Sequence, residues 1–447
     1  MPTYRIVTLG CKLNQADSAA LEGRLRSLGM ARAAPPAAVA AGSAGAVDLV
    51  VLNTCTVTAG ADREARQIAR RLRRAHPGAL LIASGCYAER DSDALRAAAA
   101  IDHVVGTEDQ AGRIEAIAAA AFGLRPDPAR RNLGPCGATE GCEAPAEPLE
   151  RTRAYLKVQD GCDLRCSYCV IPAVRGRSRS LPPERVLERI ERLAAAGYRE
   201  MVLTGVNTGD YGRDLDPPLR LHDLLDRALR RSALGRLRLN SLEPRTVTPR
   251  IRSLLASCGG RLARHLQVPL QSASDAVLSR MRRPYRIADY ARVVEDLRAA
   301  VPEIGLGADV IVGFPGETEA DFAATLRFVA SSPLNYLHVF PYSPRPGTSA
   351  AALPGQVHPR LIAERGARLR ALARRISLRF RESFVGRDLP ALTLREVRPD
   401  GRLRALTDNF IDVGVDLDGR DADALSNRLV ALRITSASET HTLARTI

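Results

Sequence analysis

Short apolar segments of strand length recur along this chain and alternate with segments of helical character. In the first part of the sequence the strand candidates are residues 4–9, 47–52 and 79–84, and residues 16–28 and 62–75 have helical character between them. Strands that alternate with helices form parallel sheets with right-handed crossovers. The sequence therefore predicts an α/β fold that begins with a parallel sheet.

The same alternation continues through the middle of the chain. After a strand candidate at 155–158, five further candidates follow, at residues 201–204, 237–240, 265–268, 307–312 and 336–340. About 200 residues with six β/α units are too few for a closed eight-stranded barrel. We therefore expect an open, partial (β/α)6 barrel.

The last part of the chain has a different texture. Residues 358–384 predict an amphipathic helix with Leu369, Leu372 and Ile376 on one face. After Gly386, short strand candidates separated by turns predict a small β-barrel of about 60 residues.

Three cysteines lie close together directly after the first strand candidate of the middle region. Cys162, Cys166 and Cys169 form a C-x3-C-x2-C pattern within GCDLRCSYCVIP. Thiolates hold iron–sulfur clusters, and three of them can ligate three irons of a [4Fe–4S] cube while the fourth iron stays open to a small ligand. A zinc site would need a fourth ligand nearby, and residues 160–221 contain no histidine. The pattern favours a cluster over zinc.

A second set of cysteines is dispersed in the sequence. Cys11, Cys55 and Cys86 each come directly after a strand candidate of the first sheet. The carboxyl ends of parallel strands lie at one edge of a sheet, where α/β folds bind ligands. The three thiols are therefore expected to converge on a second cluster; the alternative is three ordinary buried thiols.

These motifs resemble those of a known family. GCDLRCSYCVIP and the following RGRSRS at 175–180 resemble the radical S-adenosylmethionine signature. In that superfamily the open iron binds the methionine moiety, and the reduced cluster cleaves the sulfonium to a 5′-deoxyadenosyl radical. With three N-terminal cysteines and a small terminal β-domain, nearly the whole chain resembles the methylthiotransferase family. The resemblance implies that Cys11, Cys55 and Cys86 bind an auxiliary [4Fe–4S] cluster that carries or delivers sulfur.

The resemblance also indicates a substrate. TLGCKLNQADS at 8–18 and PLQSASDAVLSRMRRPY at 269–285 look most like the branch that modifies N6-threonylcarbamoyladenosine in tRNA, at carbon 2 of the adenine at position 37. Two other branches remain as alternatives, one for isopentenyladenosine in tRNA and one for an aspartate of a ribosomal protein. The isopentenyladenosine branch typically has a glutamine–methionine pair where Lys12 and Leu13 stand here. The implied partners are tRNA and an external low-potential electron donor, while the sulfur donor stays unknown.

Several polar residues follow strand candidates of the partial barrel. By the resemblance, this region approaches S-adenosylmethionine, so the candidate contacts are Gly205, Asn207, Glu243 and Gln271. A polar turn, or for Glu243 a solvated loop acid, is the alternative. Asp309 is expected to point into the barrel or to pair with an arginine. No catalytic residue is assigned.

The charge of the chain bears on its partners. A formal net charge of +15 suggests a polyanionic partner, although the terminal region is close to neutral. Arginines of that region are expected either to cluster on one side of it or to leave much of the grip to the arginine-rich helix before it; they are Arg387, Arg395, Arg402, Arg404 and Arg433. No signal segment or membrane span is visible, which indicates the cytoplasm. A metal-stabilised RNA-binding protein without enzymatic activity is the alternative class of function.

The expected organisation is an α/β chain in four parts. Residues 1–125 form a flavodoxin-like parallel-sheet domain with the auxiliary cluster, 126–150 a linker, 151–383 the radical S-adenosylmethionine barrel with its basic helix, and 384–447 a TRAM-like RNA-binding domain. The linker thiols Cys136 and Cys142 are expected to be incidental surface groups or a local metal contact, and Cys258 a structural thiol.

Overall fold

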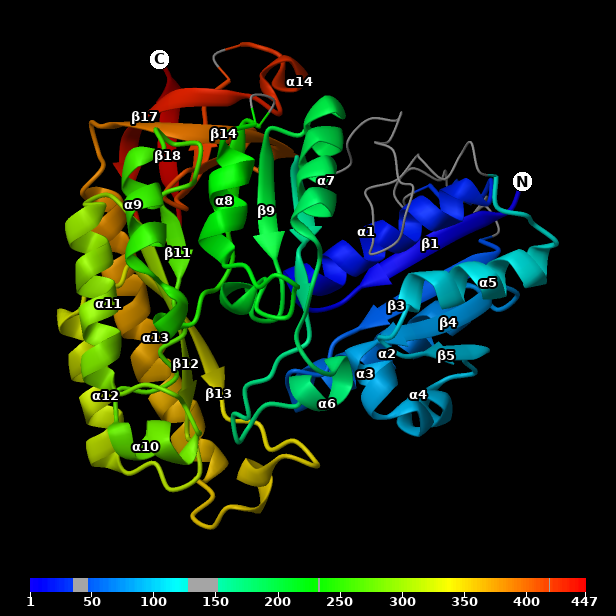
Figure 1. The fold of residues 1–447 in the computed structure, drawn as a ribbon, viewed down its shortest axis with the longest axis horizontal. Helices are drawn as coiled ribbons and strands as arrows, with labels where there is room; N and C mark the ends of the chain where they lie inside the picture. The colour runs from blue at the N-terminus through cyan, green and yellow to red at the C-terminus, as the bar shows by residue number, and fades with distance from the viewer. Residues whose placement is uncertain (35–46, 128–151, 232–233, 418) are drawn as a thin grey trace.

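The computed structural model describes residues 1–34, 47–127, 152–231, 234–417 and 419–447. Figure 1 shows a sheet with helices in the N-terminal part, a central barrel with helices around it, and a small barrel at the C-terminal end. Cys136 and Cys142 of the expected linker lie outside the described residues. No helix of the described segments combines the length and apolar character needed to cross a membrane.

The N-terminal sheet is parallel, in the order β2-β1-β3-β4-β5. Its strands are β1 (Thr3–Thr8), β2 (Ala31–Arg32), β3 (Leu49–Thr54), β4 (Leu80–Gly85) and β5 (His103–Val105). Helices α1 (Lys12–Ser27) and α5 (Gln110–Phe122) cover one face, and α2 (Ala59–Ala75), α3 (Cys86–Arg90) and α4 (Ser92–Ala98) cover the other. Every residue of β3 is buried, as a central parallel strand between two helical layers requires. The parallel sheet predicted from the apolar runs is confirmed.

The central barrel has six parallel strands in two sheets. One sheet has the order β10-β9-β6 and the other β11-β12-β13, and a bridge between Ser241 and Gln267 joins them. The strands are β6 (Arg153–Lys157), β9 (Glu200–Thr204), β10 (Arg236–Leu239), β11 (His265–Gln267), β12 (Gly305–Val312) and β13 (Tyr336–Pro341). No pairing of β6 with β13 closes the barrel among the described strands. The expected partial barrel is therefore confirmed.

Helices wrap the outside of this barrel (Figure 1). They are α7 (Pro183–Ala195), α8 (Leu221–Leu229), α9 (Pro249–Ser257), α10 (Asp275–Arg280), α11 (Ile287–Ala300), α12 (Glu319–Ser331) and α13 (Pro359–Glu382), and α6 (Ile171–Arg175) lies at the junction with the first sheet. A small hairpin of β7 (Gln159–Asp160) and β8 (Arg179–Ser180) flanks α6. Leu369, Leu372 and Ile376 of α13 lie in the barrel's hydrophobic core, as the amphipathic pattern predicts.

The interior of the barrel is polar. Alternate strand residues face opposite sides of a sheet, and Leu237 and Leu239 of β10 pack in the outer core. Arg236 and Arg238 therefore face the interior, where both donate to the fully buried Glu200 of β9. Burial alone would raise the pKa of Glu200, but the two guanidinium groups hold it well below its ordinary value. The barrel thus surrounds a polar lumen rather than an apolar core.

The C-terminal strands form a closed barrel in the order β14-β15-β16-β18-β17. They are β14 (Asp388–Val397), β15 (Leu403–Thr407), β16 (Asp412–Val415), β17 (Leu429–Ala437) and β18 (Thr442–Thr446), with α14 (Ala422–Leu425) between β16 and β17. Leu389, Val413 and Ile434 belong to its own core. Closure leaves no unpaired strand edge, which suits so small a unit.

This terminal barrel closes one end of the central lumen. Arg238 donates to the backbone oxygens of Thr407 and Asp408 at 3.0 Å each. The ring of Phe410 stacks on His265 at the start of β11, with 4.1 Å between ring centroids. These contacts lie at the amino ends of the strands, opposite to the ends from which Cys162 and its neighbours follow. The lumen therefore opens toward the cysteines.

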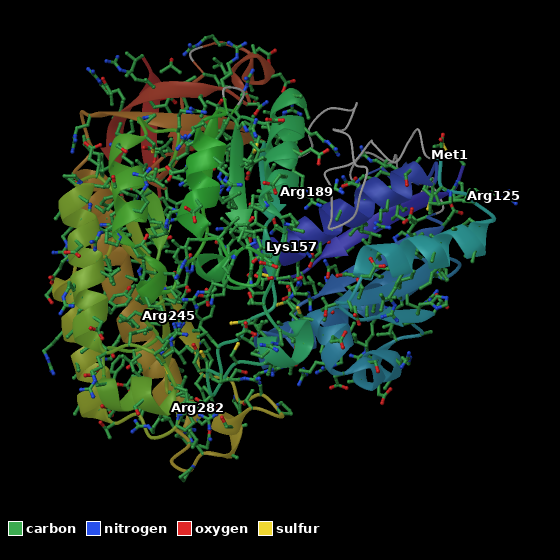
Figure 2. The ribbon with its side chains drawn as sticks, in the orientation of Figure 1. Met1, Arg125, Lys157, Arg189, Arg245 and Arg282 are labelled. Carbon is green, nitrogen blue, oxygen red and sulfur yellow. The ribbon has the colours of Figure 1, made fainter. Side chains whose placement is uncertain are left out.

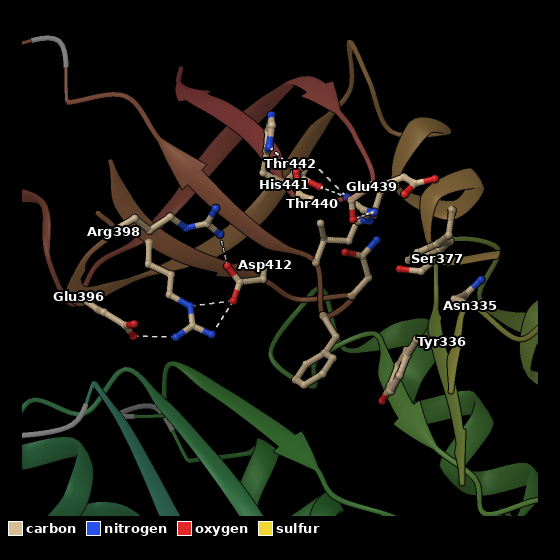
Figure 3. Close-up of a pocket in the computed structure, with 16 residues that line it drawn as sticks. Asn335, Tyr336, Ser377, Glu396, Arg398, Asp412, Glu439, Thr440, His441 and Thr442 are labelled. Atoms are coloured by element: carbon tan, nitrogen blue, oxygen red, sulfur yellow. Dashed lines mark hydrogen bonds and ion pairs between the residues drawn. The ribbon is translucent and has the colours of Figure 1, made fainter. Parts of the chain in front are cut away.

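The arginines of the terminal barrel are engaged in ion pairs. Arg404 pairs with Glu396 and Asp412 beside a cavity of about 550 Å³ between this barrel and α13 (Figure 3). Arg402 pairs with Asp400 and Asp416. Arg387 pairs with Glu303 and Arg433 with Asp388. Four of the five arginines expected to cluster for phosphate binding are thus neutralised by carboxylates.

Candidate active site between two thiol triads

The N-terminal cysteines lie at one edge of the first sheet. Cys11 follows β1 and precedes α1, Cys55 follows β3, and Cys86 begins α3 directly after β4. Gly10 has a φ of 91°, and a Cβ there would lie 2.7 Å from the Cys55 Sγ. The close approach requires glycine and brings the Cys11 turn against Cys55. The structure thus brings these predicted residues together.

The thiols of this first triad affect one another's ionisation. Burial raises the pKa of Cys86 to about 12, against the lowering effect of Arg175. Burial likewise raises the pKa of Cys55, and Cys11 adds to the rise. Thiolates grouped in this way repel one another and gain from positive charge. The group favours a cationic occupant that thiolates ligate.

The second triad lies on the loop between β7 and α6. Burial raises the pKa of Cys169 to about 12, and Cys166 and Cys162 raise it further. Arg283 donates from Nη1 to the Cys166 Sγ at 3.2 Å, and its other nitrogen pairs with Glu243. Each thiol triad therefore has one buried arginine against a sulfur atom.

Arg175 connects the two triads. It is the last residue of α6, which follows the loop of the second triad. Its Nε nevertheless donates to the Cys86 Sγ of the first triad at 3.1 Å. Its other nitrogens donate to Asn14 at 2.9 Å and Asp17 at 3.0 Å, both on α1, and a third contact is to Asp160 at 3.1 Å. A single guanidinium thus fixes the second triad's loop against the first sheet.

Other ion pairs support this junction. Lys157 of β6 donates to Asp17 at 2.5 Å and to Asp160 at 3.2 Å, where the central barrel meets α1 (Figure 2). Arg345 donates to Thr56, next to Cys55, at 2.8 Å and to Asp62 at 2.5 Å. The two halves of the candidate site are therefore held together by buried charge pairs.

Lys12 reaches from the first sheet into the barrel. Its Nζ donates to the Asn240 Oδ1 at 3.0 Å and lies 5.9 Å from the centre of the Phe410 ring. Burial, with Arg153 and Arg238 nearby, lowers the pKa of Lys12 to about 8. The residue after the first cysteine thus brings positive charge to the lumen.

The donor set fits iron–sulfur clusters better than a single metal ion. Within the described segments, no three His, Cys, Asp or Glu side chains are close enough to hold one ion together. A [4Fe–4S] cube places each thiolate on a separate iron, so its ligands stand around the cube rather than meeting at a point. Two triads of soft thiolate donors without histidine suit such clusters.

The candidate S-adenosylmethionine contacts follow the strands of the barrel at its open end. A Cβ on Gly205 would lie 2.8 Å from the Gln159 Oε1, so backbone approaches closely there. Asn207 is buried, its N–H donates to the same Gln159 oxygen at 2.9 Å, and its own Oδ1 has no partner among the described residues. Gln271 has a φ of 61° and bonds through its N–H to the Asp309 backbone oxygen at 2.8 Å. The structure brings these three residues to the rim of the lumen.

For two acidic residues the structure decides between the expected alternatives. Glu243 is not a solvated loop acid, because its side chain is 13% exposed and pairs with Arg283. Asp309 does not pair with an arginine among the described residues; its carboxylate contacts Gln267 at 2.5 Å and His338 at 3.2 Å, in the lumen. Glu243 thereby belongs to the surroundings of the second triad.

Sequence reasoning missed Arg283 entirely and gave Arg175 no role beyond the signature. Both are buried, but arginine is so frequent in this chain that nothing local distinguishes them. Position in a cysteine-bearing loop is the one available signal, and it applies only to Arg175. The isolated Cys258 packs against the barrel core, and its thiol makes local hydrogen bonds with the backbone of Leu262 at 3.3 Å and 3.7 Å, as a structural thiol would.

Family models match both parts of this site. Residues 156–329 match the model described as the Radical SAM superfamily. Residues 3–106 match the model described as uncharacterized protein family UPF0004. The first match spans the loop with the second triad, and the second spans all three cysteines of the first.

Curated relatives cover almost the whole chain. It is 34% identical over 416 residues, 92% of this chain and 90% of the relative, to the threonylcarbamoyladenosine tRNA methylthiotransferase MtaB of Bacillus subtilis (strain 168). The protein of the same name from Aquifex aeolicus (strain VF5) is 33% identical, with 91% and 95% covered. The tRNA-2-methylthio-N(6)-dimethylallyladenosine synthase of Frankia casuarinae is 36% identical, with 89% of this chain and 73% of the relative covered.

A solved structure supports the fold. The radical S-adenosylmethionine methyltransferase TsrM from Kitasatospora setae aligns with a TM-score of 0.57 at 19% identity, over 78% of this chain and 77% of that one. The family matches confirm the expected cofactors, S-adenosylmethionine and iron–sulfur clusters. With relatives of this identity along nearly its full length, the chain belongs to the methylthiotransferase family of radical S-adenosylmethionine enzymes.

Proposed function

We propose that this enzyme attaches a methylthio group to carbon 2 of N6-threonylcarbamoyladenosine at position 37 of tRNA. The observation that carries the proposal is the pair of thiol triads joined by Arg175, which donates to Cys86 on one side and to Asp160, two residues before Cys162, on the other. Two relatives that match over 90% and 95% of their own length carry this substrate in their names. Activity in the cytoplasm is part of the proposal.

The residues divide between the two triads. Cys162, Cys166 and Cys169 would hold the cluster that binds S-adenosylmethionine, and the other three cysteines the auxiliary cluster. Such groups supply radical chemistry that acid–base side chains cannot, because an aromatic C–H has neither an acidic proton nor a leaving group. Reduction of the cluster consumes an electron that the ligating thiolates do not supply. The proposal therefore includes an external low-potential electron donor.

The protein's own residues position and shield the substrates. Gly205 allows close approach of backbone to a ligand at the rim, and the free Asn207 Oδ1 is available to accept a hydrogen bond from it. Arg283 and Glu243 fix the loop of the second triad. The terminal barrel excludes water from the far end of the lumen through the Phe410–His265 stack.

We also propose the domain division given by the sequence, with residues 384–447 as a TRAM-like RNA-binding unit. In this proposal, however, the contacts with the tRNA phosphates come mainly from arginines of α13. One exposed arginine of this helix, Arg368, pairs with Glu319 and Glu364. Five other exposed arginines carry no ion pair with any described residue; they are Arg360, Arg370, Arg374, Arg375 and Arg379. This contrasts with the ion-paired arginines of the barrel itself.

The substrate is tested with reconstituted enzyme and two tRNAs, one carrying threonylcarbamoyladenosine and one isopentenyladenosine. We expect mass spectrometry of the digested nucleosides to show methylthio product from the first tRNA only. Isopentenyladenosine is the second candidate, because relatives named for its dimethylallyl form are 36% identical or slightly more. Product from that tRNA alone would reject the proposed substrate.

The phosphate grip predicts a steep salt dependence of tRNA binding. Replacing Arg370, Arg374 and Arg375 by glutamine should lower the slope of log K against log salt by about 2 to 3, since each phosphate contact contributes about 0.7 to 0.9. Filter binding between about 50 and 200 mM salt measures the slope.

The matched control removes three other exposed arginines, which also lack an ion pair with any described residue. They are Arg63, Arg71 and Arg74 of α2. This variant has the same net charge as the α13 variant, so it separates a local phosphate contact from overall charge. Equal slopes for the two variants would contradict a binding surface on α13.

A further inference from the structure

The chain contains two lysines, and their surroundings differ in one respect. Lys157 has two carboxylate partners, Asp17 at 2.5 Å and Asp160 at 3.2 Å. Lys12 has no carboxylate within ion-pair distance among the described residues. Its direct contacts are the amide oxygen of Asn240 and the face of Phe410. Lys12 therefore holds an uncompensated ammonium group in a partly buried position.

The carboxylates nearest to the lumen are already engaged. Glu200 is fully buried and bonded by Arg236 and Arg238, and Asp309 is bonded by Gln267. A charge removed from water costs free energy unless an opposite charge or hydrogen bonds compensate it. The arrangement of Lys12 is that of a receptor for an anion brought by another molecule.

The position of Lys12 relates that anion to the substrate. Lys12 comes directly after Cys11 of the first triad, whereas Asn240 follows β10 of the barrel. A base that reacts with groups held by both triads must lie between them, next to this contact. A substituent on that base therefore comes within reach of the Lys12 ammonium.

We propose that Lys12 is the receptor for the carboxylate of the threonylcarbamoyl substituent, with Asn240 and Phe410 holding its side chain in place. This rests on the proposed function and adds a residue that selects the substrate. An isopentenyl group is apolar and would leave the ammonium unpaired, and sites whose polar groups stay unpaired reject such analogues strongly. Lys12 thus attracts the carboxylate of threonylcarbamoyladenosine. It disfavours isopentenyladenosine, because that substrate would leave the ammonium group without a partner.

The test is a double-mutant cycle between Lys12 and the carboxylate. Two anticodon stem-loops are compared, one with threonylcarbamoyladenosine and one with its methyl ester, which is neutral and nearly the same size. Reconstituted wild-type enzyme should bind the acid about 10- to 100-fold more tightly than the ester, as expected for a desolvated charge pair. The Lys12→Met variant should bind both equally, and Lys12→Arg should retain part of the preference.

An unmodified adenosine stem-loop serves as the folding control. Wild type and Lys12→Met should bind it equally, because it offers no carboxylate. If Lys12→Met keeps the wild-type ratio of acid to ester, Lys12 is not the receptor. A wild-type ratio near one, with threonylcarbamoyladenosine still converted to product, would reject the receptor while leaving the proposed function intact. No conversion of that nucleoside by wild type would reject both.

Discussion

Replacement of Cys162 by alanine is expected to abolish formation of 5′-deoxyadenosine from S-adenosylmethionine. The remaining two thiols of the second triad, Cys166 and Cys169, cannot hold a cube that needs three protein ligands and an open iron. Iron in anaerobically reconstituted protein should fall from about eight to about four atoms per chain. Chromatography of the reaction products and iron analysis measure the two effects separately.

Cys258→Ser is the matched control for that experiment. Its thiol bonds locally to the backbone of Leu262 and belongs to neither triad, so both the iron content and the yield of 5′-deoxyadenosine should equal those of wild type. Wild-type iron content in the Cys162→Ala variant would show that this triad does not hold a cluster. Zinc in place of iron in the wild-type protein would overturn the cluster assignment as well.

Replacement of Cys86 by alanine is expected to separate the two halves of the reaction. The variant should still form 5′-deoxyadenosine, since the second triad is intact, but should give no methylthio product. Iron should again fall to about four atoms per chain, and the reduced protein should show one electron paramagnetic resonance signal where wild type shows two.

The position of Arg175 sharpens this second prediction. The guanidinium loses the Cys86 sulfur but keeps Asp17 and Asp160, so the junction between the sheet and the barrel should persist. Equal melting temperatures of the cluster-free variant and cluster-free wild type would show that the junction persists, because the bound cluster itself adds stability. Methylthio product at the wild-type rate would contradict a role of Cys86 in delivering sulfur.

The sequence predicted the fold because buried strands can be recognised locally, as apolar runs of strand length. Residues 49–54 and 80–85 are strands whose burial on both faces shows directly in their composition. The edge position of Cys11, Cys55 and Cys86 followed from topology alone, since successive parallel strands end on the same side. These parts needed no knowledge of side-chain contacts.

The contacts that connect the two triads have no such local signal in the sequence. Arg175 donates to Asp17, 158 residues away in the sequence, and Lys12 donates to Asn240, 228 residues away. Such contacts depend on how two separately folded sheets dock, which no periodicity records. The ion pairs of the terminal barrel's arginines were also not predicted, because they depend on strand register within that barrel. Asp388 lies directly opposite Arg433, and Asp412 lies on the strand next to that of Arg404.

The attachment of the terminal barrel has a consequence for how the enzyme can be divided. Residues 407–410 close one end of the lumen of the central barrel, because Arg238 donates to their backbone and Phe410 covers His265. A chain shortened at residue 384 would admit solvent to the buried Glu200 and its two arginines. Loss of activity on shortening would therefore result from water entry into the barrel as readily as from loss of the proposed RNA contact, so the two effects are separable only by point substitutions in the complete chain.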